Sequence, residues 1–322
     1  MIDVDAYIES VVHDEHDASI VYGMLNAPVI KLLKGAGVLV ETLKTMLSDA
    51  YSAIKSDYID NSSYIMNSLR KSITIVYPLV DHCNMSCAHC WHFSPVSKPN
   101  IVDYDMVLSD IKMLNDLFRH SSFNYTISLT GGDPLMYPHL AKLLWDIPAY
   151  QPTEWRNLVS NAMLWSKLST ELIEAFKHQG NRFSVEISRY PSMNDEQVER
   201  MAYDCDKAGI RVAVNDRPEF EVAKMFGDAY DISDRVFCHP ETNCLCSAIR
   251  NGMFYPCAAE LHSMKLGVEL PINGIPVTDF DNSDEAILMM LLPRALCRHC
   301  HVNTRTMVNW HTSKRTLDEF YE

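Results

Sequence analysis

The stretch Ser72–Trp91 reads SITIVYPLVDHCNMSCAHCW, and it decides how the rest of the chain is interpreted. Its first nine residues are mostly apolar, β-branched or aromatic, which is typical of a buried strand. The turn that follows carries Cys83, Cys87 and Cys90 in the spacing CxxxCxxC. Three thiols within eight residues can surround one metal centre from a single loop. The stretch therefore predicts a strand that ends in a metal-binding turn.

Two kinds of metal centre are compatible with this loop. An Fe–S cluster held by three cysteines would keep one iron available for a small molecule. Structural zinc normally requires four protein ligands, and His82, His89 or His92 could complete such a set.

The composition limits the setting in which these cysteines act. The chain has 322 residues, 47% of them hydrophobic, ten cysteines and a formal net charge of -14, which argues against nonspecific binding to nucleic acid. The sequence has no apolar run of membrane-spanning length and no basic, apolar N-terminal signal. We therefore expect a cytoplasmic protein of about two domains without membrane or nucleic-acid partners, in which the cysteines do not form a disulfide framework.

The region after residue 72 alternates strand-like runs with amphipathic helices, which predicts a parallel sheet covered by helices. The expected strands are 72–80, 125–130, a run near 158, 183–188 and 210–215, and the expected helices are 103–118, 138–145, 167–178 and 195–208. A complete or partial (β/α) barrel suits this series, and a doubly wound sheet is the alternative. Residues 1–71 are predicted to be a helical extension, 72–235 the barrel, and 236–322 a small cysteine-rich domain.

A second motif follows the second predicted strand, where the sequence reads Gly131-Gly132-Asp133-Pro134. Two glycines allow the backbone to approach a ligand closely, and the neighbouring carboxylate can accept hydrogen bonds from an ammonium group. Taken alone, the motif favours a tight turn between a strand and a helix.

Together the two motifs resemble the signature of the radical S-adenosylmethionine (SAM) superfamily. The resemblance implies a partial (β/α)6-type TIM barrel in which Cys83, Cys87 and Cys90 bind a [4Fe–4S] cluster, with SAM on the open iron. It also implies a set of SAM-binding residues. These are His89 near the adenine, Gly131, Gly132 and Asp133 at the amino group, Ser160 and Asn161 at the end of the third strand, and Ser188 and Arg189 at the ribose and carboxylate.

Six further cysteines lie between residue 238 and residue 300. Asn251-Gly252 is a strong hairpin signal, and the hairpin leads to Cys257. The pattern resembles the auxiliary-cluster (SPASM or twitch) domains of radical SAM enzymes. The resemblance implies one auxiliary Fe–S cluster, of the [4Fe–4S] type, ligated by Cys238, Cys257, Cys297 and Cys300, with Cys244 or Cys246 as alternates. A zinc site on the same thiolates is the alternative.

Three cysteines are then left without an assigned place in either cluster. Cys246, or alternatively Cys244, is a candidate hydrogen donor to a substrate radical. Cys205, in a predicted helix, is expected to be a core residue.

The resemblance implies a radical SAM oxidoreductase or maturase of natural-product biosynthesis. It would cleave SAM reductively to a 5′-deoxyadenosyl radical, using electrons from a donor such as flavodoxin or ferredoxin, and abstract a substrate hydrogen. The expected substrate is a ribosomally made peptide, which would be cross-linked, epimerised or oxidised. An aminosugar or aminoglycoside, dehydrogenated or epimerised, is the alternative. A zinc-stabilised binding protein without catalytic activity is the alternative of another class.

Overall fold

The computed structural model describes residues 2–26, 30, 33–51, 73–150, 155–222, 246–266, 274–300 and 306–320. Most of its strands join one mixed sheet of eight strands in the order β5-β4-β3-β2-β1-β7-β8-β9. These strands are β1 (Ile73–Val80), β2 (Tyr125–Gly131), β3 (Trp155–Ser160), β4 (Phe183–Arg189), β5 (Arg211–Asp216), β7 (Cys246–Arg250), β8 (Met253–Tyr255) and β9 (Ile275–Pro276). A separate antiparallel ribbon pairs β6 (Glu219–Val222) with β10 (Thr306–Asn309).

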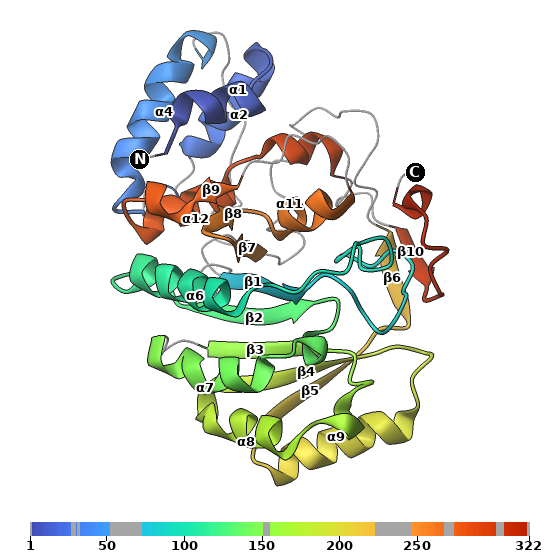
Figure 1. Ribbon diagram of the computed structural model, residues 1–322. Helices are drawn as coiled ribbons and strands as arrows, with labels where there is room; N and C mark the ends of the chain where they lie inside the picture. Colours follow the sequence, from blue (N-terminus) through green and yellow to red (C-terminus); the bar gives the residue numbers. More distant parts are fainter. Residues whose placement is uncertain are drawn as a thin grey trace.

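Strands β1 to β5 are parallel neighbours, so their C-terminal ends meet at one edge of the sheet. The helices between them are α6 (Tyr104–Phe118), α7 (Leu140–Tyr150), α8 (Thr170–His178) and α9 (Asp195–Lys207) (Figure 1). This is the mixed α/β arrangement with a mostly parallel sheet that the sequence predicts. The finer assignment as a partial (β/α)6 barrel stays a prediction.

Local sequence explains where these helices begin. Asp103, Ser169 and Asn194 each precede a helix and accept a hydrogen bond from a backbone N–H of its first turn. Such side chains satisfy donors that have no partner within the helix. Cys205 lies on the buried face of α9 and is fully buried, which confirms that it is a core residue.

The C-terminal part of the chain continues the sheet instead of leaving it. Strand β7 runs parallel to β1, and β8 returns antiparallel to β7 through the turn at Asn251-Gly252, which confirms the predicted hairpin. Both turn residues have positive φ, 56° and 74°, as a tight hairpin turn requires. This differs from the expectation that the sheet would end before residue 236. The proposed division into three domains stays a prediction.

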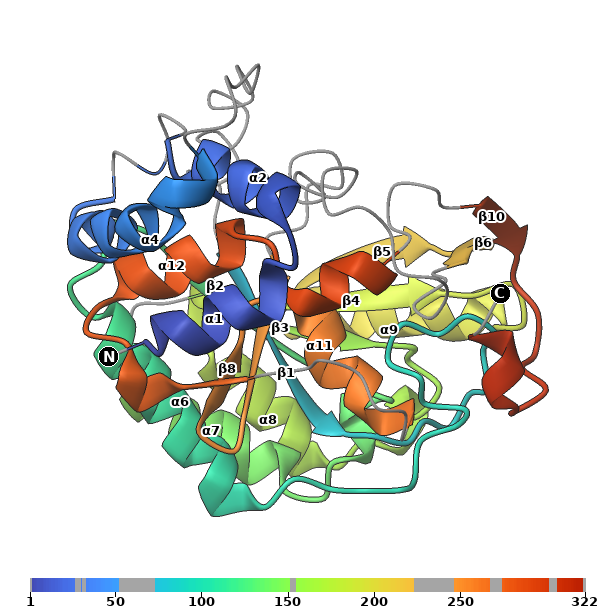
Figure 2. The ribbon, with the colours of Figure 1, turned by 90° about the horizontal axis from the view of Figure 1, so that it is seen from above.

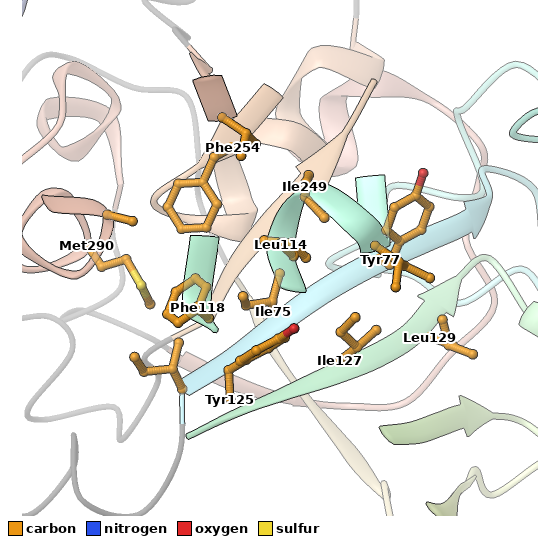
Figure 3. Close-up of a cluster of buried hydrophobic side chains, with 14 of the residues drawn as sticks. Ile75, Tyr77, Leu114, Phe118, Tyr125, Ile127, Leu129, Ile249, Phe254 and Met290 are labelled. Atoms are coloured by element: carbon orange, nitrogen blue, oxygen red, sulfur yellow. The ribbon is translucent and has the colours of Figure 1, made fainter. Parts of the chain in front are cut away.

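One buried carboxylate fixes this hairpin to the rest of the sheet. Asp110, on α6, accepts hydrogen bonds from the backbone nitrogens of Asn251 and Gly252 at 2.8 and 2.7 Å, and from the Tyr77 hydroxyl at 2.7 Å. Burial raises the pKa of Asp110, and these three donors oppose that effect. Figure 3 shows the apolar cluster around this joint, in which Ile249 and Phe254 of the hairpin lie near Ile75 of β1, Leu114 and Phe118.

The described part of residues 1–71 is helical, as predicted, and it packs on the C-terminal part. Helices α1 (Val4–Val11), α2 (Glu15–Leu25) and α4 (Ala36–Tyr51) lie beside α12 (Ser283–Leu291) in both views (Figures 1 and 2). The Tyr7 hydroxyl donates to the Pro293 carbonyl at 3.1 Å, and Arg298 pairs with Asp17. None of the helices in the described ranges has the length and apolar character needed to cross a bilayer.

We expect Asp110→Ala to lower the free energy of unfolding by about 3 kcal/mol or more, because the buried Tyr77 hydroxyl and two part-buried backbone N–H groups would lose their acceptor. Urea unfolding measures this change. The control is Asp116→Ala on the exposed side of the same helix, which should change stability by less than about 0.5 kcal/mol. Equal losses in the two variants would contradict the anchoring role of Asp110.

Candidate active site

A cavity of about 360 Å³ lies at the C-terminal edge of the parallel strands, and the cysteine loop forms one of its walls. The ends of β2, β3 and β4 bring further polar groups to it. Of the residues predicted from sequence, the following line this cavity: Cys83, Cys87, Cys90, Gly131, Gly132, Ser160, Asn161 and Ser188. The structure therefore brings together the two motifs that lie about forty residues apart in the chain.

The two glycines are required by a close approach between backbones. A Cβ on Gly131 would lie 2.2 Å from the Val80 carbonyl oxygen, and one on Gly132 would lie 1.8 Å from that of His82. Gly131 also has φ of +133°, a conformation that side chains disfavour. The Gly132 nitrogen donates to the Val80 carbonyl at 2.8 Å. The glycines thus hold the turn after β2 against the start of the cysteine loop, in addition to lining the cavity.

Asp133 does not line the cavity, because its side chain points into the protein. It is 1% exposed and accepts hydrogen bonds from Leu135 N (2.9 Å), Asn161 N (2.9 Å) and the Ser160 hydroxyl (2.9 Å). Burial raises its pKa, and the same donors oppose that effect. The carboxylate therefore joins the end of β2 to the end of β3. Its predicted contact with the SAM amino group stays a prediction.

Asn161 connects the end of β3 with the cysteine loop. Its side-chain nitrogen donates to Asn84 Oδ1 at 2.7 Å and lies 3.4 Å from Cys83 Sγ. The Met85 backbone nitrogen lies 3.3 Å from the same sulfur. A sulfur that accepts N–H donors is favoured as a thiolate, which is the form that binds metal.

The thiols are partly or fully buried. Burial, with a smaller contribution from the neighbouring charged groups and thiols, raises the pKa of Cys83 to about 12, and burial raises that of Cys87 to about 11. The three sulfurs are therefore close enough to influence one another. Metal binding must displace protons from these groups, so the cost of burying thiolates would be offset by the positive charge of iron.

These residues fit three ligands of a [4Fe–4S] cluster. Across the described ranges, no three His, Cys, Asp or Glu side chains are gathered closely enough to share a single metal ion. A cubane cluster does not require that geometry, because each thiolate binds a different iron.

His89 and Arg189 do not line the cavity. His89 has φ of 55° and packs edge-on against His311, with ring centroids 5.7 Å apart. Arg189 pairs with Asp216 on β5 and with Asp195 on α9. Their predicted contacts with SAM stay predictions, and the structure shows other partners for both side chains.

The C-terminal segment holds the cysteine loop from outside, which the sequence did not indicate. The Ala88 nitrogen donates to the His311 carbonyl at 3.0 Å, and the Ser313 nitrogen donates to the Ser86 carbonyl at 2.9 Å. Cys87 thereby forms an antiparallel bridge with Thr312. The loop is thus held between β2 on one side and the C-terminal segment on the other.

The ribbon of β6 and β10 supplies the opposite wall of the cavity. Arg217, Glu219, Phe220, Glu221 and Met307 line the cavity from this side. Tyr190, one residue beyond β4, stacks on Phe220 with ring centroids 5.6 Å apart and planes 11° apart. Burial raises the pKa of Tyr190, and the thiols of the cysteine loop raise it further, so its hydroxyl lies near them. The rule that functional residues follow parallel strands could have identified Tyr190.

The second group of cysteines is only partly described. Cys257 precedes α11 (Ala258–Ser263), and Cys297 and Cys300 lie in and after the short helix η7 (Ala295–His299). An ion pair of 3.2 Å between Glu260 and Arg294 brings these two segments side by side. Cys238 and Cys244 lie outside the described residues.

Cys246 lies at the other end of the sheet from the cavity. It pairs with Thr74, near the start of β1, whereas the cysteine loop follows the end of β1. Val80 lies six positions beyond Thr74 along the strand, which corresponds to roughly 20 Å. The structure therefore does not place this thiol where a hydrogen donor to a radical in the cavity would have to lie.

The comparisons with curated proteins find partial matches that share one name. The chain is similar to proteins named GTP 3′,8-cyclase from Rippkaea orientalis (30% identical over 101 residues), Crocosphaera subtropica (30% over 105) and Nostoc sp. (28% over 100). Each match covers 30% of this chain, and the chain spans about 30% of the length of these relatives. No family model matches the chain.

Solved structures give more distant likenesses. BtrN in complex with AdoMet and 2-DOIA has a TM-score of 0.45 and 14% identity, over 71% of this chain and 93% of that one. The enzyme anSMEcpe with bound AdoMet has a TM-score of 0.35 and 16% identity, over 44% and 42% of the two chains. These likenesses are too distant to carry an argument.

We expect Gly132→Ala to destabilise the fold by about 3 kcal/mol or more, because the added Cβ meets backbone atoms that cannot move independently. Gly37→Ala is the matched control. Gly37 lies in α4, where an added Cβ would meet no neighbouring atom within 4 Å beyond the backbone of its own helix, so its substitution should be neutral or stabilise by up to about 1 kcal/mol. Urea unfolding compares the two, and a tolerated Gly132→Ala would show that the close approach is not needed.

Proposed function

We propose that this protein is a radical SAM enzyme that modifies a ribosomally made peptide. A [4Fe–4S] cluster on Cys83, Cys87 and Cys90 would supply the electron that cleaves SAM to a 5′-deoxyadenosyl radical, which abstracts a substrate hydrogen. The observation that carries this proposal is that the three cysteines and the Gly131-Gly132 turn line one cavity. The similarity to GTP 3′,8-cyclases supports the class of chemistry.

The residues of the chain have distinct tasks in this proposal. The three thiols would hold the cluster, and the glycine turn and Asp133 fix the loop that carries them. Ser160 and Asn161, which line the same cavity, would form the polar strand end that faces SAM. Phe220, stacked on Tyr190, closes the far wall with apolar surface and would help to exclude water from a reactive radical.

For the substrate, a peptide that is cross-linked, epimerised or oxidised is our first proposal. An aminosugar or aminoglycoside is the second, because the chain is acidic and would attract a cationic molecule. Flavodoxin or ferredoxin is the proposed electron donor. The relatives named GTP 3′,8-cyclase make GTP a useful third compound in a substrate test.

We also propose one auxiliary [4Fe–4S] cluster, with Cys257, Cys297, Cys300 and Cys238 as ligands and Cys244 or Cys246 as alternates. The Glu260–Arg294 pair supports the proximity of Cys257 and Cys297, because each charged residue is three positions from one of the cysteines. Zinc on the same thiolates is the competing proposal.

Iron and sulfide assays on anaerobically prepared protein test both clusters. We expect about eight irons per chain, since each [4Fe–4S] cluster contributes four. The triple variant Cys83→Ala, Cys87→Ala, Cys90→Ala should retain about four and should form no 5′-deoxyadenosine with dithionite and SAM. Two zinc ions per chain and no response to SAM would refute the enzymatic proposal.

The Cys246→Ala variant tests the hydrogen-donor role. Because Cys246 lies at the far end of the sheet, we expect 5′-deoxyadenosine formation and product identity to match the wild type. Loss of product with SAM cleavage and iron content both retained would restore Cys246 as a donor. Cys205→Ala, which also removes a thiol outside the cavity, is the matched control.

A further inference from the structure

A buried group of charges lies directly behind the cysteine loop. Asp81, between β1 and Cys83, receives two hydrogen bonds from Arg250 at 2.8 and 3.0 Å. The Lys265 ammonium lies 3.0 Å from the same carboxylate. We call Asp81, Arg250 and Lys265 the Asp81 network.

The network is nearly inaccessible to water. The side chains of Asp81, Lys265 and Arg250 are 9%, 8% and 11% exposed. Burial alone would raise the pKa of Asp81, but the hydrogen bonds and charges of the two cations lower it below its usual range. Burial lowers the pKa of Lys265, and the charge of Asp81 opposes that effect. The carboxylate and the ammonium thus keep each other ionised.

Lys265 is the member of the network that reaches the far end of the cysteine loop. Its ammonium donates to the His92 carbonyl at 3.2 Å, and His92 lies two residues beyond Cys90. The Cys90 thiol acts to raise the pKa of Lys265, which is consistent with a short separation between them. Arg250, by contrast, faces a second carboxylate, because Asp110 also interacts with it electrostatically. Of the two cations in the network, Lys265 therefore has the more direct electrostatic effect on the cysteine loop.

We propose that Lys265 tunes the reduction potential of the cluster bound by Cys83, Cys87 and Cys90, with its buried ammonium favouring the reduced state. This inference rests on the proposed function. Reduction adds one negative charge to a cluster, and net charge and hydrogen bonding around the cluster set its potential. A fixed cation shielded from water stabilises that added charge more strongly than an exposed one would.

A purely structural role makes a different prediction. The network also joins the cysteine loop to the segment after α11, so removing either charge could loosen the loop. Loosening would move the potential in the same direction in both variants, whereas an electrostatic effect must change sign with the charge removed. Opposite substitutions therefore separate the two roles.

The experiment measures the midpoint potential of the reconstituted full chain by electron paramagnetic resonance. The signal that changes on addition of SAM identifies the relevant cluster.

We expect Lys265→Met to lower the ratio of reduced to oxidised cluster at a fixed potential by about tenfold, a negative shift of about 59 mV for one electron. Asp81→Asn should shift the potential positively. Lys265→Arg, which keeps the charge, and Lys177→Met, on the exposed face of α8, should match the wild type.

An unchanged potential in Lys265→Met, or shifts of the same sign in Lys265→Met and Asp81→Asn, would overturn the inference. If Lys265→Met fails to load iron, Asp81→Asn decides, and only a positive shift supports the proposal. The failure of the proposed function looks different, because the wild type itself would then bind no iron or form no 5′-deoxyadenosine. A wild type that cleaves SAM with potentials insensitive to Lys265 would refute the tuning role alone.

Discussion

The approach of two backbone segments at the end of β1 is the constraint on which the site depends. The turn at Gly131-Gly132 lies so close to Val80 and His82 that any side chain there would collide with backbone. This contact sets the position of the cysteine loop relative to β2. Asp133 joins the same turn to the end of β3, because it accepts a hydrogen bond from the Asn161 nitrogen. The cysteine loop and the glycine turn are therefore packed against each other, and a change in either one displaces the other.

Electrostatics impose a second constraint at the same place. The cavity gathers three thiols whose ionised forms repel one another and whose burial disfavours charge. The buried ammonium of Lys265 beside the loop and the N–H groups that donate to Cys83 favour ionised thiols. They therefore oppose both the repulsion between the thiolates and the cost of burying them. The burial of the loop thus opposes the thiolate form that the proposed metal site would need, as is expected where a site is built for binding.

Local patterns predicted those features that local chemistry controls. The strands at Ile73–Val80 and Tyr125–Gly131, the Asn-Gly hairpin and the buried Cys205 all follow from periodicity, turn residues and helix patterning. The pairing of β6 with β10 was not predictable, because more than eighty residues separate them and their register depends on tertiary packing. Cys246 shows the same limit. As a thiol outside the expected cluster ligands it is a candidate hydrogen donor, whereas the direction of β7 puts it at the opposite edge of the sheet.

The contact between the C-terminal segment and the cysteine loop has a consequence for biosynthesis. Ser86 and Ser313 are separated by more than two hundred residues, yet their backbones pair directly. Contacts of such long range form late, because closing a long loop has an entropic cost that local contacts avoid. A ribosome must also have released the segment around Thr312 before Cys87 can acquire its bridge partner. The outer side of the loop therefore stays uncovered while the intervening residues are translated, and it is covered only after that segment has emerged.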